Sequence, residues 1–244
     1  MRRGLGRGRR SSRTRRLLLG LAGLLALGLV YEAWTWPQPQ RLLRERPATT
    51  AFIDRYRATE RAARRDDRVA WTWVPYGQIA PELKRAILVA EDINFFTHHG
   101  FDLGEIGKVV DAAMADGELQ RGASTLTQQL AKNLWLSPSR NPLRKVKEAI
   151  LTWQLERTLP NRRILELYLN VAEFGPGIFG AEAAARRYFG KPATALDAAE
   201  SAQLAASLPN PRRWHPGVSS RVYRARVDRI LRRMARAEFL GHQI

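Results

Sequence analysis

The sequence predicts a mainly α-helical domain preceded by one N-terminal transmembrane helix. Three observations support this fold class. Apolar residues recur at helical spacing through the second half of the chain, and alternating runs typical of strands are short or absent. An uncharged stretch of fifteen residues follows an arginine cluster near the N-terminus. No repeat at a fixed period is visible, so we expect one helical domain within the 244 residues.

Residues 1–16 form a basic leader. They contain eight arginines and no acid, in a chain whose formal net charge is +18. Positive residues beside an apolar stretch keep that end of a chain in the cytoplasm. The leader therefore predicts a cytoplasmic N-terminus. The alternative is that the arginines bind nucleic acid, but membrane orientation explains a basic flank beside an apolar run more simply.

Residues 17–36 predict the transmembrane anchor. The stretch has 20 residues with one acid near its end, which matches the roughly 20 residues that a helix needs to cross a bilayer. An aromatic belt at the far interface would be formed by Tyr31, Trp34 and Trp36. A cleaved signal peptide is the alternative, because the run contains a small-x-small pair. Since the apolar run continues past that pair, we expect an uncleaved anchor.

Residues 37–69 are rich in proline and arginine and predict a juxtamembrane stalk that includes a helical stretch. We assign residues 70–244 to the mainly α domain. Three amphipathic helices are predicted there from apolar residues at i, i+3, i+4 and i+7. These residues are Leu83, Ala86, Ile87 and Ala90, then Val146, Ala149, Ile150 and Trp153, and then Ile164, Leu167, Tyr168 and Val171.

The composition restricts the chemistry. The chain has no cysteine, which excludes a disulfide scaffold, a thiol nucleophile and cysteine-based metal centres. Its four histidines are too scattered for a convincing site made of histidine alone. Hydrophobic residues make up 45% of the chain, so it can bury a core and is not a disordered polycation.

Glu91 is the first candidate catalytic residue. It follows Ile87 by four residues and Leu83 by eight, and so lies on the apolar face of a predicted helix. Burial of a carboxylate raises its pKa towards the range in which a general base or acid works. Asp92 points elsewhere on the helix and could orient backbone or an arginine. A solvated helix end beside neighbouring cations fits the same spacing.

A capped helix start is predicted after Ser124. Thr125 and Gln128 have the spacing of a capping box, and Lys132 and Asn133 lie about two turns further on. A helix N-terminus that presents N–H groups and hydroxyls can bind an anion. Taken alone, the segment fits an ordinary capped helix equally well.

Arg144 and Glu148 are spaced as a helical i, i+4 pair. Such a pair is usually a modest surface salt bridge. With Lys145 and Lys147, however, three cations surround one acid, and this arrangement suits a pyrophosphate leaving group. The acid would then orient the cations or hold a divalent ion. The spacing leaves both interpretations open.

Five ordered blocks together resemble the lysozyme-like glycosyltransferase domain of peptidoglycan polymerases. The family includes bifunctional penicillin-binding proteins and monofunctional biosynthetic peptidoglycan transglycosylases. The resemblance spans roughly residues 70–217. The blocks are Glu91-Asp92-x-x-Phe95-Phe96-x-His98-x-Gly100, Gly122-Ala-Ser124-Thr125-Leu-Thr127-Gln128-Gln129-Leu-x-Lys132-Asn133, Arg144-Lys145-x-x-Glu148, Ile164-Leu-Glu166-x-Tyr168-Leu-Asn170 with Phe189-Gly190-Lys191, and Ala199-Glu200-x-Ala-x-Leu-Ala-Ala-x-Leu-Pro209-x-Pro211.

The resemblance implies catalytic roles for Glu91 and Glu148. Glu91 would deprotonate the GlcNAc 4-hydroxyl of an acceptor lipid II, whose oxygen attacks the anomeric carbon of the donor MurNAc. Undecaprenyl pyrophosphate leaves, and the centre inverts to a β-1,4 link. Glu148 would serve the donor pyrophosphate. No cofactor is implied as essential, although Glu148 can hold a divalent ion such as Mg or Mn. The implied substrate-binding residues are Asp92, Phe95, His98, Ser124, Thr125, Gln129, Lys132, Asn133, Arg144 and Lys145.

Two absences within the sequence favour the monofunctional type. About 30 residues follow the last block, which leaves no room for a transpeptidase domain, and no Ser-x-x-Lys or Lys-Thr-Gly motif is present. The expected partners are lipid II, the nascent glycan strand, the membrane and cell-wall synthesis proteins, without nucleic acid. The expected location is the bacterial cytoplasmic (inner) membrane, crossed once, with the catalytic domain on the periplasmic side.

Two alternatives remain open at this point. A peptidoglycan-cleaving lysozyme-like enzyme also uses a glutamate in a mainly α fold, but its polymeric substrate carries no pyrophosphate and gives no reason for the cation cluster. A non-enzymatic membrane scaffold or polyanion binder would depend on the arginines instead. The substitution Glu91→Gln separates these classes, because a scaffold would keep its function.

Overall fold

The computed structural model describes residues 8–102, 104, 107, 124–137, 139 and 141–244. The chain divides into two compact units, Met1–Gln38 and Pro39–Ile244. The first unit holds α1 (Gly8–Trp34), on which Leu17, Leu18, Leu19, Leu21, Leu24 and Leu27 are exposed. The stretch Arg15–Leu43 is long and apolar enough to cross a membrane, a test that signal sequences also pass. The predicted N-terminal apolar helix is therefore confirmed.

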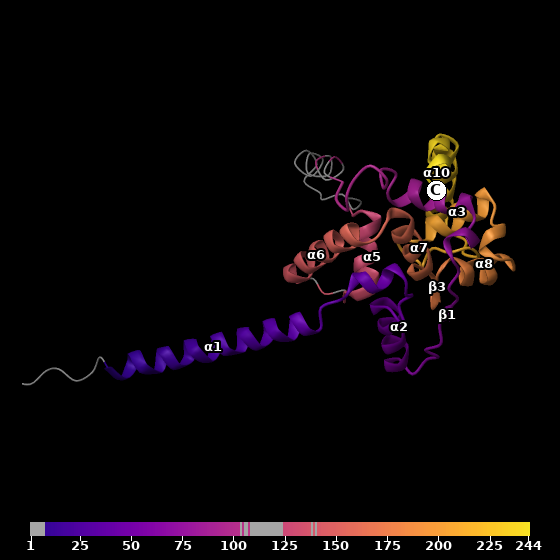
Figure 1. The fold of residues 1–244 in the computed structure, drawn as a ribbon. Helices are drawn as coiled ribbons and strands as arrows, with labels where there is room; N and C mark the ends of the chain where they lie inside the picture. The colour runs from indigo at the N-terminus through magenta and orange to yellow at the C-terminus, as the bar shows by residue number, and fades with distance from the viewer. Residues whose placement is uncertain (1–7, 103, 105–106, 108–123, 138, 140) are drawn as a thin grey trace, which may run out of the picture. The chain divides into compact units, whose positions relative to one another are not determined.

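The second unit is mainly helical, as the sequence predicts (Figure 1). Its strands are only two or three residues long. In chain order the elements are η1 (Pro39–Leu43), α2 (Ala51–Ala62), β1 (Ala70–Trp71), η2 (Tyr76–Gln78), α3 (Pro81–Glu91), α5 (Leu126–Trp135), α6 (Pro142–Thr158), α7 (Asn161–Val171), β2 (Glu173–Gly175), β3 (Ile178–Phe179), α8 (Ala181–Phe189), η3 (Ala193–Ala195), α9 (Ala198–Ser207), α10 (Arg221–Ala235) and η4 (Glu238–His242).

The core brings α3 and α5 together with the helices that cover them. α3 packs against α9 and α10, while α5 packs against α2, α6 and α7. The predicted apolar face of α7 is fully buried. That of α3 is buried at Leu83, Ala86 and Ile87 and partly exposed at Ala90. Burying a large aliphatic side chain contributes about 1.5–3 kcal/mol, so these faces hold the site-bearing helices firmly.

α6 differs from α3 and α7 in the face that it buries. Val146, Ile150 and Trp153, which define its predicted apolar stripe, are 56%, 42% and 52% exposed. The buried apolar residues are instead Leu151 and Leu155, on the side of α6 that packs against the core. The helix is confirmed, but its predicted stripe lies on the surface.

A small sheet connects the N-terminal part of the second unit to the region after α7. Its strand order is β1-β3-β2, with β1 parallel and β2 antiparallel to β3. The β2–β3 turn contains Gly177 at a φ of +71°, and a Cβ there would lie 2.7 Å from the Tyr56 hydroxyl. Glycine is therefore required where α2 approaches this turn.

α2 lies within residues 37–69, the predicted stalk, and packs against α5. Its N-cap is Thr50, whose hydroxyl accepts a hydrogen bond from the Ile53 N–H at 3.1 Å. The compact unit consequently begins at Pro39 rather than near residue 70. Leader residues 1–7 and residues 121–123 of the second block lie outside the described residues.

Candidate active site

Glu91 is the last residue of α3, and its side chain is 12% exposed. Its Oε2 accepts a hydrogen bond from Gln129 Nε2 at 2.9 Å, and its Oε1 accepts one from Arg226 Nη2 at 3.0 Å. Burial raises the pKa of Glu91, although Gln129, Arg226 and Lys132 act in the opposite direction. The buried-carboxylate interpretation is therefore confirmed over the solvated helix end.

The amide of Gln129 is oriented by α7. The Tyr168 hydroxyl, which is buried, donates to Gln129 Oε1 at 2.9 Å. Because the amide oxygen accepts from Tyr168, the amide N–H₂ faces Glu91. Side chains from α3, α5 and α7 thus form one hydrogen-bonded chain that ends at the candidate base.

Asp92 connects the end of α3 to the start of α5. Its Oδ2 accepts from the Leu126 N–H at 2.8 Å, and its Oδ1 lies 2.9 Å from His98 Nε2. His98 Nδ1 accepts from the Gly100 N–H, so the neutral ring carries its proton on Nε2 and donates it to Asp92. Burial lowers the pKa of His98, but the hydrogen bond and charge of Asp92 outweigh it, and that pKa is raised.

Phe95 supports the same segment from the core. Its ring is 1% exposed and packs edge-on against Phe96 and His98, with ring centroids 5.0 and 6.4 Å apart. Asp92, Phe95 and His98 therefore fix the backbone that follows Glu91.

The predicted capping box at the start of α5 is present. Thr125 Oγ1 accepts from the Gln128 N–H, and Gln128 Oε1 accepts from the Thr125 N–H at 3.0 Å. The Thr125 hydroxyl also donates to the Gly100 carbonyl oxygen at 2.7 Å. With Asp92 on the Leu126 N–H, this N-terminus already holds a carboxylate, so the ordinary capped helix describes it better than a free anion site.

A cationic cluster surrounds Glu148 on α6. Glu148 is 3% exposed, its Oε2 accepts from Arg144 Nη1 at 2.9 Å, and its Oε1 pairs with Lys145 Nζ. Burial lowers the pKa of Lys132, while the charges of Glu148 and Glu91 act to raise it. Lys132 therefore lies within the electrostatic reach of both acids and links the Glu91 site to the cluster.

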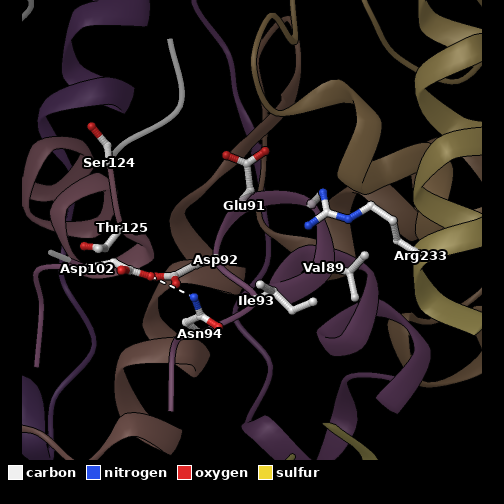
Figure 2. A pocket seen from close by; sticks show the side chains of 10 residues that line it. Val89, Glu91, Asp92, Ile93, Asn94, Asp102, Ser124, Thr125 and Arg233 are labelled. Carbon is white, nitrogen blue, oxygen red and sulfur yellow. Dashed lines mark hydrogen bonds between the residues drawn. The ribbon is translucent and has the colours of Figure 1, made fainter. Parts of the chain in front are cut away.

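One cavity is lined by Glu91 itself, and a second is lined by its hydrogen-bond partner Gln129. The first has a volume of about 200 Å³ and is lined by Glu91, Asp92 and Ser124, with Arg233 reaching towards it from α10 (Figure 2). The second has a volume of about 270 Å³ and comes close to Glu91 through Gln129, which lines it together with Lys132, Asn133 and Tyr168. The predicted residues just before α5, Ser124 and Thr125, thus line the first cavity. The predicted residues on α5, which are Gln129, Lys132 and Asn133, line the second.

The surroundings of Glu148 do not fit a divalent metal ion. Each of its oxygens already faces a cation, Arg144 or Lys145. Within the described ranges, no group of three or more His, Asp or Glu side chains is placed to hold a metal. We therefore derive no chemical step through a metal ion.

α10 contributes residues that the sequence analysis missed. It lies beyond the last block, and buried Tyr223, Ile230 and Met234 anchor it. Arg226 contacts Glu91 directly, and Arg233 lines the first cavity. The apolar spacing of α10 signals a helix, but nothing local shows which of its arginines reaches a residue 135 positions away.

The structure combines a mainly helical domain with a carboxylate, Glu91, that is shielded from solvent, and with cations gathered around Glu148. The transglycosylase family model matches residues 58–235, and the chain belongs to that family.

Three relatives are each named biosynthetic peptidoglycan transglycosylase. The chain is 44% identical to that of Laribacter hongkongensis over 218 residues, covering 89% of this chain and 96% of the relative. It is 46% identical to that of an Azoarcus species over 218 residues, covering 89% and 94%. It is 47% identical to that of Rhodospirillum centenum over 220 residues, covering 90% and 88%. The resemblance drawn from the five blocks is confirmed.

Proposed function

We propose that the protein polymerises lipid II into β-1,4-linked glycan strands, with inversion at the donor carbon and release of undecaprenyl pyrophosphate. The observation that carries this proposal is the pairing of buried Glu91 with the cationic cluster at Glu148, linked by Lys132. The relatives' common name supports a role in making peptidoglycan.

Glu91 acts as the general base. Each of its oxygens accepts one hydrogen bond from the protein and retains a lone pair for the acceptor's 4-hydroxyl. Its raised pKa makes it a stronger base than an exposed glutamate. As the hydroxyl proton moves to Glu91, the hydroxyl oxygen bonds to the donor's anomeric carbon and the bond from that carbon to pyrophosphate breaks.

The cationic cluster stabilises the leaving group. Negative charge develops on the pyrophosphate as its bond to the sugar breaks, and fixed cations lower the energy of that state. Glu148 holds Arg144 and Lys145 on one turn of α6 and offsets their mutual repulsion. The charges of both Glu148 and Glu91 act on Lys132, so its ammonium group can interact with a donor pyrophosphate bound near the two acids.

The same cluster separates this proposal from peptidoglycan cleavage. A finished glycan has no pyrophosphate, so a cleaving enzyme would bury Glu148 with its cations to no chemical purpose. We also propose that the enzyme is monofunctional. The relatives support this, because the chain spans 96%, 94% and 88% of their lengths and their shared name mentions transglycosylation alone.

We propose that α1 anchors the protein once in the bacterial inner membrane, with its N-terminus in the cytoplasm and the catalytic unit on the periplasmic side. The exposed leucines of α1 and its basic leader support this orientation. α6 supports a second membrane contact, because Leu143 and Val146 are 73% and 56% exposed. α6 also packs against η1, the first element of its unit after the anchor.

The test uses the purified full-length protein in detergent with radiolabelled lipid II, and with cell-wall sacculi in a parallel reaction. We expect labelled glycan polymer and free undecaprenyl pyrophosphate from lipid II, and intact sacculi. Solubilised sacculi with unconsumed lipid II would contradict the proposal and favour a cleaving enzyme.

A further inference from the structure

Arg226 on α10 contacts the candidate base Glu91 directly, in addition to its place in the packing of α10. Its Nη2 lies 3.0 Å from Glu91 Oε1, and the guanidinium side chain is 26% exposed. Its Nε is buried without a hydrogen-bond partner. An unpaired buried donor is unusual in a folded protein, whereas Nη2 of the same guanidinium bonds directly to Glu91.

The charges around Glu91 come from three sides. α5 provides Lys132, and α10 provides Arg226. The cavity that Glu91 lines is also lined by Arg233 and by two acids, Asp92 and Asp102. α7 provides the neutral Tyr168 hydroxyl, which reaches Glu91 through Gln129. α9, which packs on α3, carries one acid, Glu200, and that acid pairs with Lys191. Of the described residues, Arg226 is the cation in direct hydrogen-bond contact with Glu91.

The ionisation of Glu91 depends on opposing influences, and the contact from α10 is one of them. Burial and the position of Glu91 at a helix C-terminus both disfavour its ionised form. A base that is protonated before the substrate arrives cannot take the hydroxyl proton. A directly bonded guanidinium opposes burial and also fixes the plane of the carboxylate.

We propose that Arg226 is a positioning residue that keeps Glu91 ionised and oriented for proton abstraction. The inference rests on the proposed function, in which Glu91 is the base, and it extends the catalytic apparatus to α10, beyond the last of the five blocks.

The experiment measures the ionisation of Glu91 directly and then its effect on turnover. Full-length protein labelled with ¹³C at glutamate side-chain carboxyls is titrated by NMR, and Glu91→Gln identifies the Glu91 signal by its loss. In Arg226→Gln we expect the Glu91 midpoint to rise by roughly one pH unit or more. The acid limb of kcat/KM for lipid II should move to higher pH by the same amount, because the base must be ionised.

Two further variants make the result specific. Arg226→Lys keeps the charge and should restore most of the wild-type midpoint, whereas Arg226→Met, which keeps the aliphatic stem, should behave as Arg226→Gln does. Arg224→Gln is the matched control, because Arg224 is exposed two residues away on the same helix and points to the opposite side. The titration midpoint of Glu91 in the Arg224→Gln variant should equal that in the wild-type protein.

Two results would overturn the proposal. One is an unchanged Glu91 midpoint in both Arg226→Gln and Arg226→Met. The other is an equal rise in Arg224→Gln, which would reflect net charge alone. The titration needs no substrate, so it decides the role of Arg226 even if the wild-type protein fails to polymerise lipid II, a failure that would contradict only the proposed function.

Discussion

Individual hydrogen bonds in this site fix side-chain orientation more than they add stability. Gln129 could present either end of its amide to Glu91, and the Tyr168 hydroxyl selects the N–H₂ end. The sequence predicts that Tyr168 lies on a buried helix face. It does not predict that the Tyr168 hydroxyl bonds to a residue 39 positions away. Periodicity therefore predicts that a side chain is buried, but the partner of its polar atom depends on tertiary packing.

Replacing Tyr168 with phenylalanine should disturb catalysis through Gln129. The change leaves the partly buried Gln129 Oε1 without its donor, at a cost of about 0.5–1.5 kcal/mol in unfolding free energy. The amide can then turn its oxygen towards Glu91, and we expect kcat for lipid II to fall about tenfold or more.

Steady-state kinetics and thermal melting check this prediction. Tyr188→Phe is the control, since its hydroxyl makes only a 3.3 Å contact with the Phe174 carbonyl oxygen. A wild-type kcat in Tyr168→Phe would show that Gln129 needs no orienting partner.

At the scale of elements, α6 shows what the spacing of apolar residues can and cannot predict. The spacing correctly predicts a helix, yet Leu151 and Leu155 form a second apolar face beside the stripe of Val146, Ile150 and Trp153. A helix with two apolar faces does not reveal from its own sequence which face packs on α5. Only the surrounding helices decide that the stripe remains exposed.

The same stripe gives a prediction about the membrane. The chain has no cysteine, so Val146→Cys introduces a single labelling site. In lipid vesicles, we expect a fluorophore at this position to be quenched by bromine-labelled lipid and shielded from aqueous iodide, because exposed apolar side chains partition into the bilayer.

An exposed position on α8, Arg187→Cys, serves as the control and should remain accessible to iodide. If iodide quenched the label at position 146 as strongly as the control label, α6 would not contact the membrane.

On the scale of the whole molecule, the net charge of +18 separates into groups with different roles. The leader arginines precede an apolar helix, Arg144 and Lys145 surround Glu148, and Arg226 contacts Glu91. The sequence showed the first group because it is contiguous, and the second because it occupies one helical turn. It could not show the third, since α10 meets α3 only in the folded chain.

The second compact unit includes α2, which lies in the range that the sequence predicts as a stalk. Proline and arginine between residues 37 and 69 read as a stalk, but α2 lies in this range and packs against α5, and its Phe52 and Arg55 line the second cavity. The composition of a segment indicates its stiffness and charge, but it does not indicate whether the segment packs against a distant helix. Residues 39–69 therefore belong to the architecture of the site.

The most direct test of the central claim is lipid II turnover by Glu91→Gln, with lipid II binding measured on the same preparation. Loss of the general base should lower kcat by about 10²-fold or more and leave binding largely unchanged, because the cationic cluster is intact. Glu182→Gln, which alters a buried carboxylate paired with Arg186 on α8, should retain turnover. Polymerisation by Glu91→Gln at the wild-type rate would contradict the assignment of Glu91 as the base.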